Sequence, residues 1–282
     1  SNDSPESQAL HGAYRESLQG HSLLLELLDD SDPSIRASSA GVLACLPTVA
    51  GMSVPGLVSR RAREPVGWVR AAIAFALGEL GNIEELRHIL AEDPSPEAQC
   101  MAACELARLS PDPSLFEPLL RFAAEPIEDY DRIPGAGGKS TGDAADAISR
   151  LPQSMRWQAV PTLFESLRQA RSFDTEPLVR TLISSAFEPR DAPLAVLTEE
   201  QRQILIGLVD CQEIWNIGGL FGLLRSYGLP PDRNTCAQLA GVQFVHDKAH
   251  EALSTGVAYS KMGFHGKARE FIERRSEEHT SE

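Results

Sequence analysis

The sequence predicts an all-α fold, a solenoid built from stacked antiparallel helix pairs. The first observation is the stretch from Pro65 to Gly81, whose apolar residues follow helical spacing between a proline suited to a helix start and a glycine suited to a stop. The second is that this pattern recurs along the chain. The third is that another apolar helix pattern follows each copy. One such pair cannot bury its apolar face alone, so the copies are expected to stack.

The copies of the first helix align on their apolar positions. Placing Arg36 on Arg70 also superimposes one large aliphatic residue per copy, which we expect in the core. A weaker fifth copy runs from Val179 to Phe187. In chain order the aligned aliphatic residues are Leu43, Leu77, Leu106 and Ile148.

The second helices share a proline that is followed two residues later by leucine. Because proline suits the first turn of a helix, the pattern predicts that each second helix begins near its proline. The copies are Val54-Pro55-Gly56-Leu57, Glu117-Pro118-Leu119-Leu120 and Val160-Pro161-Thr162-Leu163, and Ile83 to Leu86 fits without the proline.

The segment Asp32-Pro33-Ser34-Ile35-Arg36 before an alanine-rich helix, with a proline and leucine in the next helix, resembles HEAT repeats. The resemblance covers residues 22–187 and extends to bacterial HEAT-repeat proteins of unknown function. It implies a right-handed α-solenoid, with a repeat array over residues 1–187 and an inserted loop at 126–142. Residues 188–274 are expected to form further helical hairpins that continue or cap the array.

The C-terminal residues 275–282 resemble a translated sequencing adapter. Their sequence is Arg-Ser-Glu-Glu-His-Thr-Ser-Glu, which is polar and has no counterpart in the repeats. We therefore treat this segment as a disordered artefact and leave it out of the fold prediction.

Composition narrows the classes of function. The net charge of −14 opposes binding to nucleic acid or to an anionic membrane surface, and no apolar run approaches the roughly 20 residues of a membrane span. The arginines at 60, 61, 63 and 70 are interpreted as a solvated helix end. Five scattered cysteines indicate free thiols in a reducing, cytoplasmic compartment, and Cys100 with Cys104 are interpreted as packed side chains.

One motif could hold a metal ion. His246 and His250 lie four residues apart, as in the zinc-binding His-Glu-x-x-His pattern, with Asp247 in place of the glutamate and Glu251 as a possible third ligand. A metal-dependent hydrolase is thus one alternative function. A HEAT-like bilin lyase or other ligand carrier is another. The favoured interpretation is a surface pair of histidines, with no cofactor.

The favoured function is a non-enzymatic scaffold that binds a protein partner. In a two-helix solenoid we expect the second helices to line the concave side, and the loop after Glu125 to flank that groove. The two positions after each aligned leucine mix arginine, histidine and aromatic residues, which are typical of interface anchors. The predicted partner-binding residues are Arg87, His88, Arg121, Phe122, Phe164 and Glu165, with Tyr130 and Arg132 from the loop.

Overall fold

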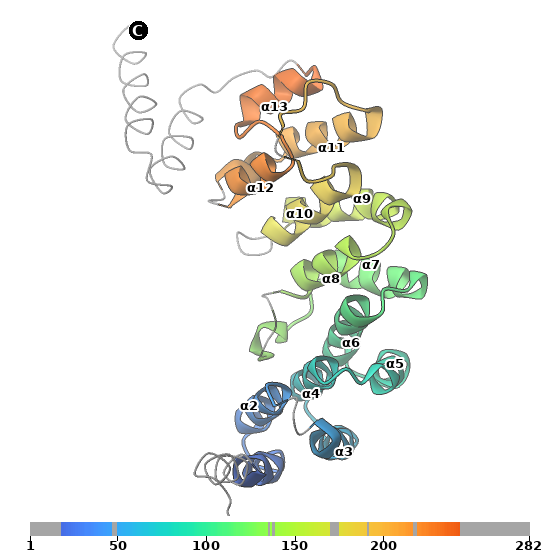
Figure 1. Cartoon of the computed structure of the whole chain (residues 1–282), viewed down its shortest axis with the longest axis vertical. Coiled ribbons are helices and arrows are strands. Elements are labelled where there is room, and N and C mark those ends of the chain that lie inside the picture. Colours follow the sequence, from blue (N-terminus) through green and yellow to red (C-terminus); the bar gives the residue numbers. More distant parts are fainter. Residues whose placement is uncertain are drawn as a thin grey trace, which may run out of the picture. The chain divides into compact units, whose positions relative to one another are not determined.

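The computed structural model describes residues 18–46, 50–134, 136, 139–169, 175–190, 192–216 and 219–242. Every regular element among them is helical, so this part of the chain is all-α, as predicted (Figure 1). The chain divides into two compact units, Ser1–Pro152 and Gln153–Glu282. None of the helices in the described ranges combines the length and the apolar character needed to cross a membrane.

The helices follow one another with short connections. The described part of the first unit starts with helical residues 18–27 and continues with α2 (Pro33–Ala44), α3 (Ala50–Arg61), α4 (Gly67–Glu79), α5 (Ile83–Glu92), α6 (Pro96–Leu109), η2 (Pro113–Leu115), α7 (Phe116–Ala124), η3 (Tyr130–Arg132) and α8 (Ser140–Ser149). The second unit contains α9 (Gln153–Gln169), α10 (Thr175–Ala186), α11 (Glu199–Asp210), η4 (Gln212–Asn216), α12 (Leu220–Ser226) and α13 (Arg233–Ala240).

Helix α4 confirms the prediction for the stretch that ends at Gly81. Val69, Ile73 and Leu77 are fully buried on the predicted face. Gly81 has a φ of 74°, a left-handed conformation that glycine adopts without strain, and the N–H of Asn82 donates to the carbonyl oxygen of Leu77 at 2.9 Å. The helix therefore stops where the sequence predicted.

The prolines do not mark every second-helix start. Pro55 lies inside α3 and Pro161 inside α9, so the expectation that these helices begin at their prolines is wrong. Pro118 lies near the start of α7, as expected. A proline inside a helix forfeits one backbone hydrogen bond, and both helices continue through that loss. A capping box formed by Thr198 and Gln201 opens α11.

In the first unit the first helices of the pairs form a continuous layer. Helices α2, α4, α6 and α8 pack against one another in that order, and small side chains permit the close approach. The second helices α3, α5 and α7 contact the first helices beside them far more than they contact one another. The second helices therefore diverge and form the more open side. That the second helices line the concave side of a solenoid stays a prediction.

The inserted segment lies on the first-helix side. We call its residues 126–134 the strap. Tyr130 and Ile133 of the strap are buried, and the Tyr130 hydroxyl donates to the Asp143 carboxylate of α8 at 3.1 Å. A methyl group placed on Gly41 of α2 would lie 3.5 Å from Cβ of Pro134. The strap thus reaches from α8 back to α2, away from α3 and α5 (Figure 1), and it does not flank the second helices as expected.

One hydrogen-bond arrangement recurs at the start of three successive first helices. The side chains of Arg36, Arg70 and Gln99 each donate to the backbone carbonyl oxygen of the residue six positions earlier, at 2.9, 2.8 and 2.7 Å. Each of those earlier residues is acidic, and its carboxylate accepts the backbone N–H two residues further on. These acidic residues are Asp30, Glu64 and Asp93.

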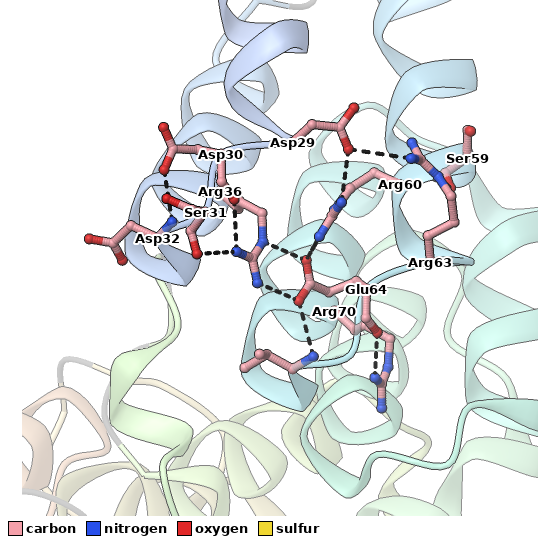
Figure 2. Close-up of polar contacts among 11 residues, drawn as sticks. Asp29, Asp30, Ser31, Asp32, Arg36, Ser59, Arg60, Arg63, Glu64 and Arg70 are labelled. Atoms are coloured by element: carbon pink, nitrogen blue, oxygen red, sulfur yellow. Dashed lines mark hydrogen bonds and ion pairs between the residues drawn. The ribbon is translucent and has the colours of Figure 1, made fainter.

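The arginine of one pair also binds the carboxylate of the next pair. Arg36 Nε and Nη2 each donate to one carboxylate oxygen of Glu64 at 2.8 Å (Figure 2). Arg70 Nε donates to the Asp93 carboxylate at 3.0 Å. The carboxylate side chains of Glu64 and Asp93 are 0% and 1% exposed. Each ion pair therefore joins neighbouring helix pairs, and we call the series the carboxylate ladder.

The ladder corrects the interpretation of the arginine cluster as a solvated helix end. Arg60, Arg61 and Arg70 are only 12–13% exposed and are paired with carboxylates, whereas Arg63 is 58% exposed. Arg60 lies 2.6 Å from Glu64, and both are drawn in Figure 2. Because three of the four arginines are paired inside the protein and the exposed Arg63 lies 3.5 Å from Asp29, the cluster offers no unpaired basic surface.

The second unit packs by the same kind of helix contact. Helix α10 lies against α9 and α11, and α11 lies against α13. The Phe164 ring of α9 packs on Gly207 of α11, where a side chain at 207 would collide with it. The Trp215 indole N–H donates to the carbonyl oxygen of Leu208 at 3.0 Å. These contacts fix α9 to α11 and the segment that follows it.

Candidate partner-binding surface

The predicted partner-binding residues divide into exposed and buried sets. Five side chains are exposed and available to a partner, and three are buried within the fold. The exposed residues are Arg87 and His88 on α5, Arg121 on α7, Arg132 on η3 and Glu165 on α9. The buried residues are Phe122, Tyr130 and Phe164.

The burial of Phe122 follows from the register of α7. Leu119 is fully buried while Leu120 is half-buried, so the inward face is one residue out of step with the alignment on Leu120. Residues three apart share one helix face, which places Phe122 inside with Leu119 and leaves Arg121 outside. The Arg121 guanidinium lies over the Phe122 ring, 4.6 Å from its centroid.

A groove opens on the second-helix side between α5 and η2. Its volume is about 290 Å³. Its floor is apolar, because Leu106 and Leu115 are buried and Leu90 is half-buried. Polar residues stand at its edges. The full lining is Arg87, Leu90, Ala91, Leu106, Ser110, Asp112, Ser114 and Leu115. The groove exists because α5 and α7 diverge, so the sequence alignment alone did not reveal it.

Arg87 stands at the edge of this groove without a bonded partner. Among the described residues of the first unit, it is the one arginine whose side chain forms no hydrogen bond or ion pair. The other described arginines of the first unit donate hydrogen bonds to carboxylates, to a side-chain amide oxygen or to backbone carbonyl oxygens. A guanidinium with free donors is well suited to bind a carboxylate from outside the chain.

Asp112 provides the opposite charge at the groove. Its carboxylate accepts the Ser114 backbone N–H at 2.8 Å. A hydrogen bond from the Ser114 side chain, that backbone bond and the nearby charge of Arg87 lower the pKa of Asp112. Asp112 is therefore ionised at neutral pH, and the groove presents one cation and one anion beside an apolar floor.

The neighbouring exposed residues extend this surface. His88 lies 3.5 Å from Glu92 on the same helix. The Arg121 guanidinium donates to the Gln99 side-chain oxygen at 3.1 Å, which holds it against α6. Arg121 comes six residues after Leu115, about 9 Å further along α7 at the rise of an α-helix. One partner segment can therefore contact both the groove and Arg121.

Two thiols lie beneath the strap on α6. Cys100 is fully buried and Cys104 is half-buried. A hydrogen bond with Cys100 and burial raise the pKa of the Cys104 thiol, and burial raises the pKa of the Tyr130 phenol above them. The Cys104 thiol and the Tyr130 phenol are therefore neutral at physiological pH. In the part of the chain that the structure describes, no three or more His, Cys, Asp or Glu side chains are grouped to hold a metal ion.

The predicted metal motif lies outside the described residues. His246, His250 and Glu251 all belong to residues 243–282, as does the adapter-like tail, so their interpretation stays a prediction. A scan against protein-family models and searches of the curated proteins and of the solved structures found no match to this chain. The geometry above therefore carries the functional argument.

Proposed function

We propose that this chain is a HEAT-like protein, a right-handed α-solenoid that acts as a scaffold by binding a protein partner through its second helices. The repeated bonds at the starts of the first helices, together with the carboxylate ladder, support the repeat assignment, because residues at the same position make the same kind of bond in successive helix pairs. The proposal includes a cytoplasmic location, which the scattered cysteines of the sequence support.

The proposed binding of a protein partner rests on the groove at Arg87. On the second-helix side this groove combines an apolar floor with an arginine that forms no hydrogen bond or ion pair to a described residue. Apolar floors with arginine at the edge are typical of interface hot spots. The proposed contact residues on this side are Arg87, His88 and Arg121.

A paired charge reversal tests this proposal. A partner is first isolated from the native source with the full-length protein and then purified. Arg87→Glu combined with Arg121→Glu should leave the fold intact, because both side chains are exposed, and should weaken binding of the purified partner at least about tenfold, as for loss of a charged hot spot. Unchanged affinity would place the interface elsewhere.

The alternative functions gain no support from the described residues. The metal-dependent hydrolase depends on the His246 and His250 pair, which is not among them. For a bilin lyase or another ligand carrier, no feature of the described part favours the assignment over protein binding. The non-enzymatic scaffold remains the proposal that the surface supports best.

A further inference from the structure

We infer that the groove between α5 and η2 binds a short segment of a partner protein in which a single carboxylate side chain stands beside a large aliphatic side chain. This inference rests on the proposed function and names the chemistry of the partner. Three properties of the groove define that chemistry: its floor, its cation and its anion.

The floor selects an aliphatic side chain. Leu106 and Leu115 are 2% and 4% exposed, so the floor is formed by packed leucines. It offers no charged group, and a partner side chain there would remove from water its own apolar surface and that of the half-buried Leu90 and the exposed Ala91. With a volume of about 290 Å³, the groove can admit a side chain but not a folded element.

The cation selects a carboxylate. Arg87 has five donor N–H groups, and no hydrogen bond or ion pair to a described residue occupies them. A carboxylate accepts two of these donors in parallel, which adds geometric specificity to the charge attraction. An acidic residue next to the aliphatic one would reach Arg87 from the groove.

The remaining charges limit the partner to one carboxylate at this place. Asp112 lies at the same groove and repels a second acidic residue, while it accepts hydrogen bonds from a backbone N–H or a basic side chain. The whole chain has a net charge of −14, which repels a strongly acidic tail at long range. A mixed sequence with one acidic residue fits better than an acidic run.

The test uses a displayed library of random dodecapeptides selected on the full-length protein. Enriched peptides are expected to share Asp or Glu next to Leu, Ile or Met. Synthetic copies should lose at least tenfold in affinity on the Arg87→Glu variant and much less on Arg87→Lys. A peptide whose acidic residue is replaced by lysine should regain affinity for Arg87→Glu.

The control is Arg225→Glu in the second unit, which makes the same charge change at an exposed arginine outside the groove. The Arg225→Glu variant should bind the selected peptides with the same affinity as the unchanged protein. All variants should keep the same melting temperature. Peptides that bind Arg87→Glu equally well would overturn the inference but leave the proposed function standing. Recovery of no binding peptide would count against both.

Discussion

Arg36 holds Glu64 by two parallel hydrogen bonds of 2.8 Å across 28 positions of sequence. Both side chains are buried, and Glu64 also accepts the backbone N–H of Val66 at 3.0 Å. The carboxylate thus joins the start of α4 to the start of α2. Removing one member of a buried ion pair leaves the other charge unmatched, which costs far more than the net value of the pair.

Replacing Glu64 by glutamine should therefore destabilise the protein strongly. Glu64→Gln leaves the guanidinium of Arg36 buried without a counter-charge, and the expected loss is about 3–5 kcal/mol. Thermal and urea unfolding would measure it. The matched control is Arg63→Gln, because Arg63 is 58% exposed and its loss should cost less than about 1 kcal/mol. Equal effects of the two changes would contradict the ladder.

The same pair predicts a dependence of stability on pH. Burial alone would raise the pKa of Glu64, but hydrogen bonds from Arg36 and Arg60 outweigh it and lower the pKa from 4.5 to about 2. Since the folded pKa lies below the unfolded one, ionised Glu64 contributes fully above pH 4.5, and the contribution is lost as the pH falls toward 2.

Comparison with Glu64→Gln isolates this effect. The difference in unfolding free energy between the unchanged protein and the variant should shrink steadily between pH 5 and pH 2, as the carboxyl takes up a proton in both states. Unfolding curves recorded at several pH values would show it. A difference that stays constant over this range would mean that Glu64 is not held as the ionised partner of Arg36.

Loss of Tyr130 should expose the thiols under the strap. Tyr130→Ala removes a fully buried ring, and such a cavity costs about 3–5 kcal/mol in a packed core. In a Cys45→Ser background, which removes the exposed thiol, disulfide-exchange labelling of Cys100 and Cys104 should speed up about tenfold or more.

Tyr130→Phe is the control for the strap. It keeps the packing and loses the 3.1 Å hydrogen bond to Asp143, so labelling should change little. Peptide mapping by mass spectrometry would assign the labelled cysteines. If labelling of Cys100 and Cys104 did not change in Tyr130→Ala, the strap would not be what shields these thiols.

A charge in the first-helix layer should abolish cooperative unfolding. Leu77 is fully buried within α4, where Leu77→Asp would place an unpaired carboxylate and cost about 3 kcal/mol or more. Calorimetry would record the loss of the transition. Leu23→Asp is the control, because Leu23 is 55% exposed and the change should shift the transition only slightly. A normal transition for Leu77→Asp would refute the packed layer.

The sequence could predict the helices and their inward faces because these depend on local spacing. Leu77 lies in the core and Gly81 ends α4, as the periodic pattern and the glycine required. The partners of Arg36 and Arg70 could not be predicted, because the spacing of 28 and 23 residues to their carboxylates varies with connection length. The one hint of these ion pairs in the sequence was that Arg36 and Arg70 occupy the same position in the aligned first helices.

The candidate site was predicted less well than the fold. Arg87 and Arg121 are exposed as expected, but Phe122 faces inward because the alignment of α7 was one residue out of register. The direction of the strap could not be foreseen, since burial of Tyr130 depends on α6 and α8 together. The groove arises from the divergence of second helices, which is a property of packing and leaves no local pattern.

The central claim is that a partner binds the second-helix side, and site-specific photo-crosslinking tests it most directly. A benzoylphenylalanine is placed at His88 on α5 in one variant and at Asp131 on the strap in another; both positions are exposed. With the purified partner, the account predicts a crosslinked product from position 88 and none from position 131. A product from position 131 without one from position 88 would contradict it.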